Sequence, residues 1–129
     1  MTEQEFAAKA AETVKQIVDA IAGKEYERIA SFAQIDSSWM KPGQTQEEAF
    51  QAFGEWLDGQ LAMWAEDEER EFVVDHFDES CLDDIELEED KSFVTYNPTN
   101  SGEELDFWFE IEFNMDKNEQ ISATFNVNI

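Results

Sequence analysis

The sequence predicts an α+β domain, in which two or three N-terminal helices pack on one face of a C-terminal antiparallel meander sheet of four to five strands. Three observations predict this fold. Apolar residues recur every three or four positions in residues 3–66, which indicates amphipathic helices. Apolar and polar residues alternate in residues 71–129, which indicates half-buried strands. The 11 Phe, 4 Trp and 2 Tyr of this 129-residue chain supply the bulk of one core, so residues 1–129 are expected to form a single domain.

The first predicted helix covers residues 3–22. Thr2 and Glu5 have the spacing of a capping box at its start. Gly23 follows the last apolar position, where we expect a left-handed C-terminal cap. The apolar face of this helix consists of Phe6, Ala10, Val14, Ile17, Val18 and Ile21. A second, shorter helix is predicted over residues 25–34.

A third helix is predicted over residues 46–66. Thr45 and Glu48 repeat the capping-box pattern before it. Its apolar stripe consists of Phe50, Phe53, Leu57, Leu61 and Trp64. Such a stripe is typical of a core-facing helix, and we interpret it in that way. Between the second and third helices, residues 35–44 are expected to be irregular, with Trp39 tucked into the core.

Two long strands are predicted near the C-terminus, over residues 105–113 and 121–129. A polar connection joins them, which is typical of a hairpin. Their inward-facing residues are Leu105, Phe107, Phe109, Ile111 and Phe113 on one strand, and Ile121, Ala123, Phe125, Val127 and Ile129 on the other. These rows are expected to pack against the helices.

Shorter strands are predicted before this hairpin. Residues 93–96 form one of them, and the turn formers in residues 97–102 indicate the loop that follows it. Alternation also predicts strands at residues 72–77 and around Ile85 and Leu87.

The net charge of the chain is −24, from 32 acidic and 8 basic residues. Nucleic acids and anionic membranes require clustered cationic contacts, and the eight Lys and Arg residues are scattered singly, so we expect neither as a partner. A basic protein is the electrostatically favoured partner. The acidic N-terminus, the single Cys81 and the lack of an apolar stretch of about 20 residues predict a cytoplasmic location.

Residues 12–32 read ETVKQIVDAIAGKEYERIASF. This run resembles the opening of the nuclear-transport-factor-like (SnoaL-like, cystatin-like cone) superfamily, which has an amphipathic helix, a small-residue turn, an acidic-aromatic pair and a second helix. The resemblance covers residues 12–35 and the order of elements. It implies a curled antiparallel sheet and either an enzyme or a non-catalytic binding module. The sequence departs from the superfamily where the segment around Trp39 replaces its early strand, and no polar catalytic group can be placed inside the cone.

Candidate catalytic residues are few. His76 is the only histidine, and its neighbour Asp75 would point to the opposite face of a strand. We interpret His76 as a partly exposed strand residue, with a general base paired to a distant carboxylate as the alternative. Cys81 has acidic neighbours that disfavour a reactive thiolate. The glycines form no phosphate-binding loop, and the carboxylates match no metal-site motif, so we expect no catalytic residue, cofactor or metal.

The strongest feature is an acidic run, because residues 66–90 hold 14 of the 32 acidic residues and one basic residue. We predict that this run docks a basic partner, as in an immunity-type or inhibitor-type protein. Trp108 is predicted to be an exposed anchor on the acidic side of its strand. The other candidate site residues are Glu66, Asp67, Glu68, Glu69, Asp83, Asp84 and Glu86.

Three alternatives stay open at this stage. The acidic run can be a solvated face that maintains solubility and protects a sheet edge from aggregation. The chain can be a small-molecule-binding or enzymatic pocket protein of the nuclear-transport-factor-like type, with His76 or a buried carboxylate in the cone. It can also be a soluble domain whose role depends on partners outside this chain.

Overall fold

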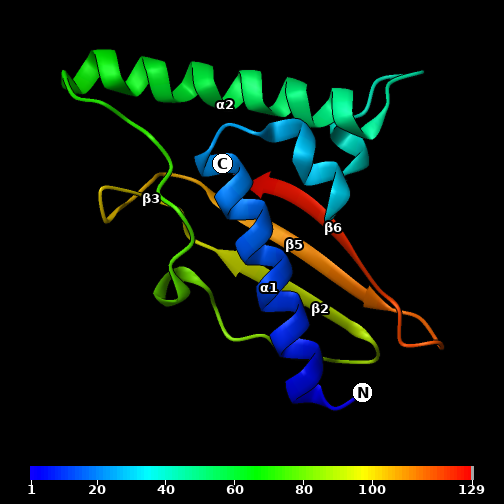
Figure 1. Ribbon diagram of the computed structural model, residues 1–129. Helices are drawn as coiled ribbons and strands as arrows, with labels where there is room; N and C mark the ends of the chain where they lie inside the picture. The colour runs from blue at the N-terminus through cyan, green and yellow to red at the C-terminus, as the bar shows by residue number, and fades with distance from the viewer. Residues whose placement is uncertain (129) are drawn as a thin grey trace.

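A computed structural model describes residues 1–128 and has an α+β fold, as predicted (Figure 1). Helix α1 lies across one face of a four-stranded sheet, and helix α2 lies along the upper end of the same layer in this view. The helices are α1 (Glu3–Ala22) and α2 (Gln46–Glu68), with 3-10 helices η1 (Tyr26–Ser31), η2 (Ser37–Trp39) and η3 (Glu79–Cys81). The strands are β1 (Gln34–Ile35), β2 (Lys91–Tyr96), β3 (Thr99–Asn100), β4 (Glu103–Glu104), β5 (Trp108–Met115) and β6 (Ile121–Asn128).

The main sheet has the order β1-β6-β5-β2. Strands β2, β5 and β6 form the predicted antiparallel meander. Strand β1 corrects the prediction in two respects, because it pairs parallel to β6 and lies within the part of the chain that was assigned to helices. Gln34 lies opposite Thr124, so a short early strand exists where the sequence predicted the end of the second helix and the start of an irregular segment. A separate two-stranded sheet begins with β3 inside the predicted loop at residues 97–102, and its second strand, β4, directly follows that loop.

Helix α1 has the predicted bounds, and the Thr2 hydroxyl accepts a hydrogen bond from the Glu5 backbone N–H at 3.1 Å. The predicted left-handed cap at Gly23 is wrong, because Gly23 has a φ of −85°. Lys24 takes the left-handed conformation instead, with a φ of 57°. The Glu25 N–H donates to the Ala20 carbonyl at 2.8 Å, which completes a Schellman motif whose left-handed position falls one residue after the glycine.

The second predicted helix is the 3-10 helix η1, which is shorter than predicted. Helix α2 begins at Gln46 as predicted and ends at Glu68, two residues later than predicted. Its capping box is confirmed, since the Thr45 hydroxyl accepts from the Glu48 N–H and the Glu48 carboxylate accepts from the Thr45 N–H.

The core forms where the stripe of α2 meets the inward row of β6. The Phe125 ring lies at the centre, with its centroid 5.1 Å from that of Phe53 and 5.3 Å from that of Phe109. Trp39 is half-buried and meets the Phe53 ring edge-on at 5.6 Å. The inward rows are buried as predicted over Phe107, Phe109, Ile111, Phe113, Ala123, Phe125 and Val127, whereas Ile121 and Leu105 are half-buried. Ile129 lies outside the described residues.

The strands predicted at residues 72–77 and around Ile85 and Leu87 are wrong, since neither segment forms a strand. In the first segment the backbone groups are satisfied elsewhere. The Val73 N–H donates to the side chain of Asn100 at 3.0 Å, and the Phe77 N–H donates to the Asp19 carboxylate at 2.9 Å. These tertiary partners replace a strand ladder. No helix within residues 1–128 has the length and apolar character needed to cross a membrane.

Candidate functional site

The structure divides the acidic run into two separate groups. Glu66, Asp67, Glu68 and Glu69 lie at the C-terminal end of α2, which is the upper left corner of Figure 1. Asp83, Asp84 and Glu86 lie on the chain that leads into β2, at the bottom of the same view. In this view the irregular chain between α2 and η3 descends along the left side of the molecule and separates the two groups. Residues 66–90 therefore do not form one face.

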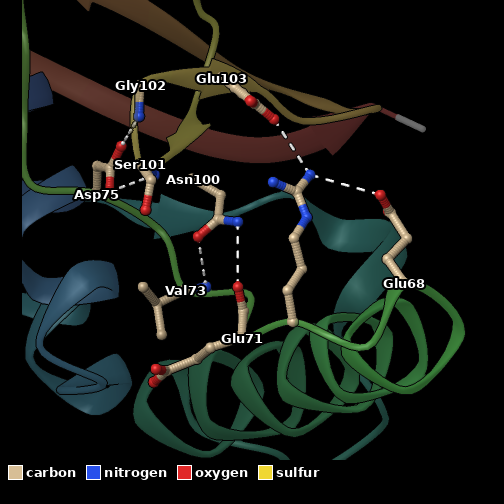
Figure 2. Close-up of polar contacts among 9 residues, drawn as sticks. Glu68, Glu71, Val73, Asp75, Asn100, Ser101, Gly102 and Glu103 are labelled. Atoms are coloured by element: carbon tan, nitrogen blue, oxygen red, sulfur yellow. Dashed lines mark hydrogen bonds and ion pairs between the residues drawn. The ribbon is translucent and has the colours of Figure 1, made fainter.

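The group at the end of α2 makes internal contacts (Figure 2). The Arg70 guanidinium lies 3.4 Å from the Glu68 carboxylate and 3.1 Å from that of Glu103. The same guanidinium lies 4.7 Å from the centroid of the Phe72 ring. The single base of the acidic run thus joins the end of α2 to strand β4, and Glu68 is the member of this group that it engages.

Asp75 was not predicted as a functional residue, and it holds the turn between β3 and β4 (Figure 2). Its carboxylate accepts hydrogen bonds from the Thr99 hydroxyl at 2.7 Å and from the N–H groups of Gly102 and Ser101 at 2.8 and 3.0 Å. Burial opposes ionisation of Asp75, but these hydrogen bonds outweigh it and lower the pKa of the carboxyl group. Asp75 is therefore a structural residue rather than a partner of His76.

The second acidic group lies in a hairpin-like arrangement with β2. The segment of residues 82–88, which we name the edge segment, runs antiparallel to β2 and is joined to it by a turn. Its ends are fixed by bridges between Leu82 and Tyr96 and between Glu88 and Lys91. The edge segment has one residue more than β2 between these bridges, so pairing fails in the middle. This bulge is the physical reason that the predicted strand around Ile85 and Leu87 does not form.

The bulge leaves part of the β2 edge unpaired. The Lys91 N–H donates to the Glu88 carbonyl at 2.9 Å, and the Thr95 carbonyl accepts from the Asp83 N–H at 3.1 Å. Odd-numbered residues of β2 therefore direct their backbone N–H and carbonyl groups to the edge of the sheet. Phe93 lies between the two β2 residues, Lys91 and Thr95, that form these hydrogen bonds. Neither its N–H nor its carbonyl has a hydrogen-bond partner within residues 1–128.

A groove of about 730 Å³ occupies this opening, and we name it the edge groove. It is lined by Asp84, Glu86, Glu88, Glu89, Lys91, Ser92 and Phe93. The Phe93 side chain is 75% exposed, the largest exposed fraction among the large apolar side chains described. None of the four carboxylates forms an ion pair with another residue in the range 1–128. Sequence reasoning missed Phe93, although its alternation with the apolar Val94 and Tyr96 places it on the opposite face.

The sheet face that carries Phe93 is the face turned away from the helices. In β5 the side chains on this face are Trp108, Glu110, Glu112 and Asn114, which are exposed or half-buried. Trp108 is 37% exposed, and its indole N–H donates to the Glu110 carboxylate at 3.0 Å. Trp108 thus lies on the same uncovered face as Phe93. On β5 it is two residues before Glu110, which pairs with Thr95 of β2.

The helix-facing side of the sheet offers no comparable polar site. Its β5 residues Phe109, Ile111 and Phe113 are at most 1% exposed, and the helices fill the space above them. The polar groups on this side of β2 are the hydroxyls of Ser92 and Tyr96, whose residues are 3% and 1% exposed. The Tyr96 hydroxyl accepts from the Asp78 N–H at 2.9 Å. This packing disfavours the alternative of a ligand pocket inside the sheet, because the side chains on this face are buried in the core.

His76 lies outside the edge groove. Its Nδ1 is 3.2 Å from the Asp19 carboxylate, so it has a distant carboxylate partner rather than Asp75. Its side chain is 76% exposed, and it lies in an irregular segment rather than a strand. Cys81 is half-buried in η3. Within residues 1–128 no three His, Cys, Asp or Glu side chains are arranged to hold a metal ion.

No protein-family model matches this chain, and neither a curated protein nor a solved structure matches it. The resemblance to the nuclear-transport-factor-like superfamily therefore stays a prediction. The case for a function rests on the geometry and charge of the edge groove and of the uncovered sheet face.

Proposed function

We propose that this chain is a non-catalytic binding protein that docks a basic protein partner, in the manner of an immunity-type or inhibitor-type protein in the cytoplasm. The docking surface is the β2 edge with the adjoining uncovered sheet face. One observation carries the proposal: Phe93 is 75% exposed beside a groove lined by four unpaired carboxylates. Trp108 extends the surface along the same face as a second aromatic contact.

Electrostatics favours a basic partner at this surface. The whole chain carries a net charge of −24, so its potential attracts a cationic protein from a distance and raises the rate of association. At close range the carboxylates of Asp84, Glu86 and Glu88 are free to pair with the partner, since no residue of the range 1–128 neutralises them. The group at the end of α2 is less suited, because Arg70 already bridges Glu68 to Glu103.

Solubility accounts for the acids but not for Phe93. A solvated strand face is best served by polar or charged residues, and a long exposed apolar edge invites aggregation. An exposed aromatic ring at the centre of the acidic edge instead resembles an interface anchor, which supplies contact area while the charges around it provide specificity.

Charge reversal at each acidic group tests the proposal. The double variant Asp84→Lys/Glu86→Lys changes the β2 edge, and Glu66→Lys/Asp67→Lys makes the same charge change at the end of α2. The tagged chain and both variants are used to capture proteins from the source cell at a series of salt concentrations. The captured protein is then purified and titrated against each chain.

We expect the wild type and the α2 variant to retain a basic protein at low salt and to lose it as the salt concentration rises. The β2 edge variant should lose it at all salt concentrations while unfolding at the same denaturant concentration as wild type. Equal capture by the two variants contradicts the proposed surface. Capture that does not weaken with salt contradicts the proposed electrostatic mechanism.

A further inference from the structure

The edge groove has an excess of hydrogen-bond acceptors. Four carboxylates line it, and the Phe93 carbonyl faces it without a partner. Lys91 supplies the single cationic side chain among its lining residues. A ligand that satisfies this groove is therefore a cation with several N–H donors.

The dimensions of the opening select a side chain over a peptide strand. The hydrogen bonds that join the edge segment to Lys91 and Thr95 are four residues apart on β2, which is about 13 Å along a strand. An added strand could pair with Phe93 only after the edge segment had broken its bonds at both ends. A side chain that enters from the uncovered sheet face requires no such break, because the Phe93 ring and the carboxylates are already exposed there.

We propose that the edge groove binds the guanidinium group of an arginine side chain on the basic partner. This inference rests on the proposed function and specifies which residue the partner presents. The planar guanidinium stacks on the exposed Phe93 ring, and its five N–H groups reach the carboxylates and the Phe93 carbonyl. A lysine ammonium has three donors on one atom, is more strongly hydrated and cannot stack, so it fits these acceptors less well.

The test uses three capped pentapeptides that differ only at the central residue: Ac-Ala-Ala-Arg-Ala-Ala-NH₂ and its lysine and citrulline counterparts. Each is titrated into the ¹⁵N-labelled chain at low salt, and the amide resonances are followed by NMR. We expect the arginine peptide to shift the amides of Ser92, Phe93 and Val94 most strongly. It should bind about fivefold more tightly than the lysine peptide, and the uncharged citrulline peptide should not bind measurably.

Two variants of the groove and one matched control locate the binding. Phe93→Thr removes the ring and keeps a residue with high strand propensity. Glu86→Gln/Glu88→Gln removes two groove charges, and each of these variants should weaken arginine binding by about tenfold. The control Glu47→Gln/Glu55→Gln removes the same charge from exposed positions on α2 and should leave binding within twofold of wild type. Circular dichroism and thermal unfolding check that every variant is folded.

Equal affinity for the arginine and lysine peptides, or shifts that spread over the surface without a maximum at Phe93, would overturn the arginine inference. The proposed function fails separately: it fails if the β2 edge variant still captures the basic protein. If capture depends on Asp84 and Glu86 while the arginine peptide does not prefer the edge groove, then the function stands and the arginine inference is wrong.

Discussion

The ring of Tyr26 lies directly against the backbone of Gly54. A Cβ atom built on Gly54 would lie 2.0 Å from Cδ2 of Tyr26, well inside any van der Waals contact. Tyr26 is 4% exposed, and its hydroxyl donates to the Asp58 carboxylate at 2.6 Å, one helical turn beyond Gly54. Burial and then this hydrogen bond raise the pKa of the Tyr26 hydroxyl. Because Gly54 has no side chain, η1 can pack directly against the backbone of α2 at this position.

Gly54→Ala is expected to destabilise the domain, although alanine is the better helix former. Overpacking in a filled core costs about 1–3 kcal/mol, and the gain in helix propensity is at most about 1 kcal/mol. We expect a net loss of about 1–2 kcal/mol in the free energy of unfolding, measured by urea denaturation.

Gly59→Ala is the matched control for that substitution. Gly59 lies on an exposed face of the same helix, and a Cβ atom there meets nothing within 4 Å. It should stabilise the domain by about 0.5–1 kcal/mol. If both alanine variants are more stable than wild type, the contact between Gly54 and Tyr26 is not as tight as described.

Asp75 should make the stability of the domain depend on pH. Its folded pKa lies below the ordinary value of 3.8, so the unfolded chain binds more protons than the folded chain between these two values. The stabilisation is fully present above about pH 5 and is lost as the pH falls through the folded pKa.

Asp75→Asn should lower the free energy of unfolding at pH 7 by about 1–3 kcal/mol, because its amide N–H₂ replaces one of the two carboxylate oxygens and then opposes the N–H of either Ser101 or Gly102. The difference between variant and wild type should shrink below pH 4, measured by denaturation at each pH. A difference that stays constant down to pH 2 would show that Asp75 does not titrate as described.

The turn that joins the edge segment to β2 is strained. Glu89 and Asp90 have φ values of 49° and 65°, a pair of left-handed residues that two-residue hairpin turns usually build from Asn and Gly. Glu89→Asn/Asp90→Gly should therefore raise the free energy of unfolding by about 1–2 kcal/mol. An unchanged urea midpoint would mean that the turn relaxes without cost in the wild type.

Periodicity predicted the long elements well, because each has enough residues to show its buried face. The bounds of α1 and the alternating rows of β5 and β6 follow from local sequence alone. Strand β1 has only two residues, and its partner β6 lies about 90 positions further along the chain, so no local pattern reveals it. The segment around Val73 alternates like a strand, but Asn100 and Asp19 take up its backbone donors, which only the tertiary structure decides.

The candidate site was predictable in part. The sequence located the acids, but contiguity in the chain suggested one face, whereas the path from α2 to β2 separates the end of α2 from the edge segment. Phe93 lies on the same face of β2 as Thr95 and on the opposite face from the apolar Val94. This alternation already indicates that the Phe93 side chain points away from the core. The extra residue in the edge segment, which opens the groove, depends on the pairing register and has no signal in the sequence.

Hydrogen exchange can detect the unpaired edge directly. The Val94 N–H faces β5, where Val94 lies opposite Ile111, whereas the Phe93 N–H faces the edge groove without a partner. We expect the Phe93 amide to exchange at least about a hundredfold faster than that of Val94, since exchange at Val94 requires a larger opening of the sheet. The Lys91 amide, which donates to Glu88, should exchange more slowly than that of Phe93. Similar protection at Phe93 and Lys91 would show that the edge segment pairs along its whole length, and the edge groove would then be closed in solution.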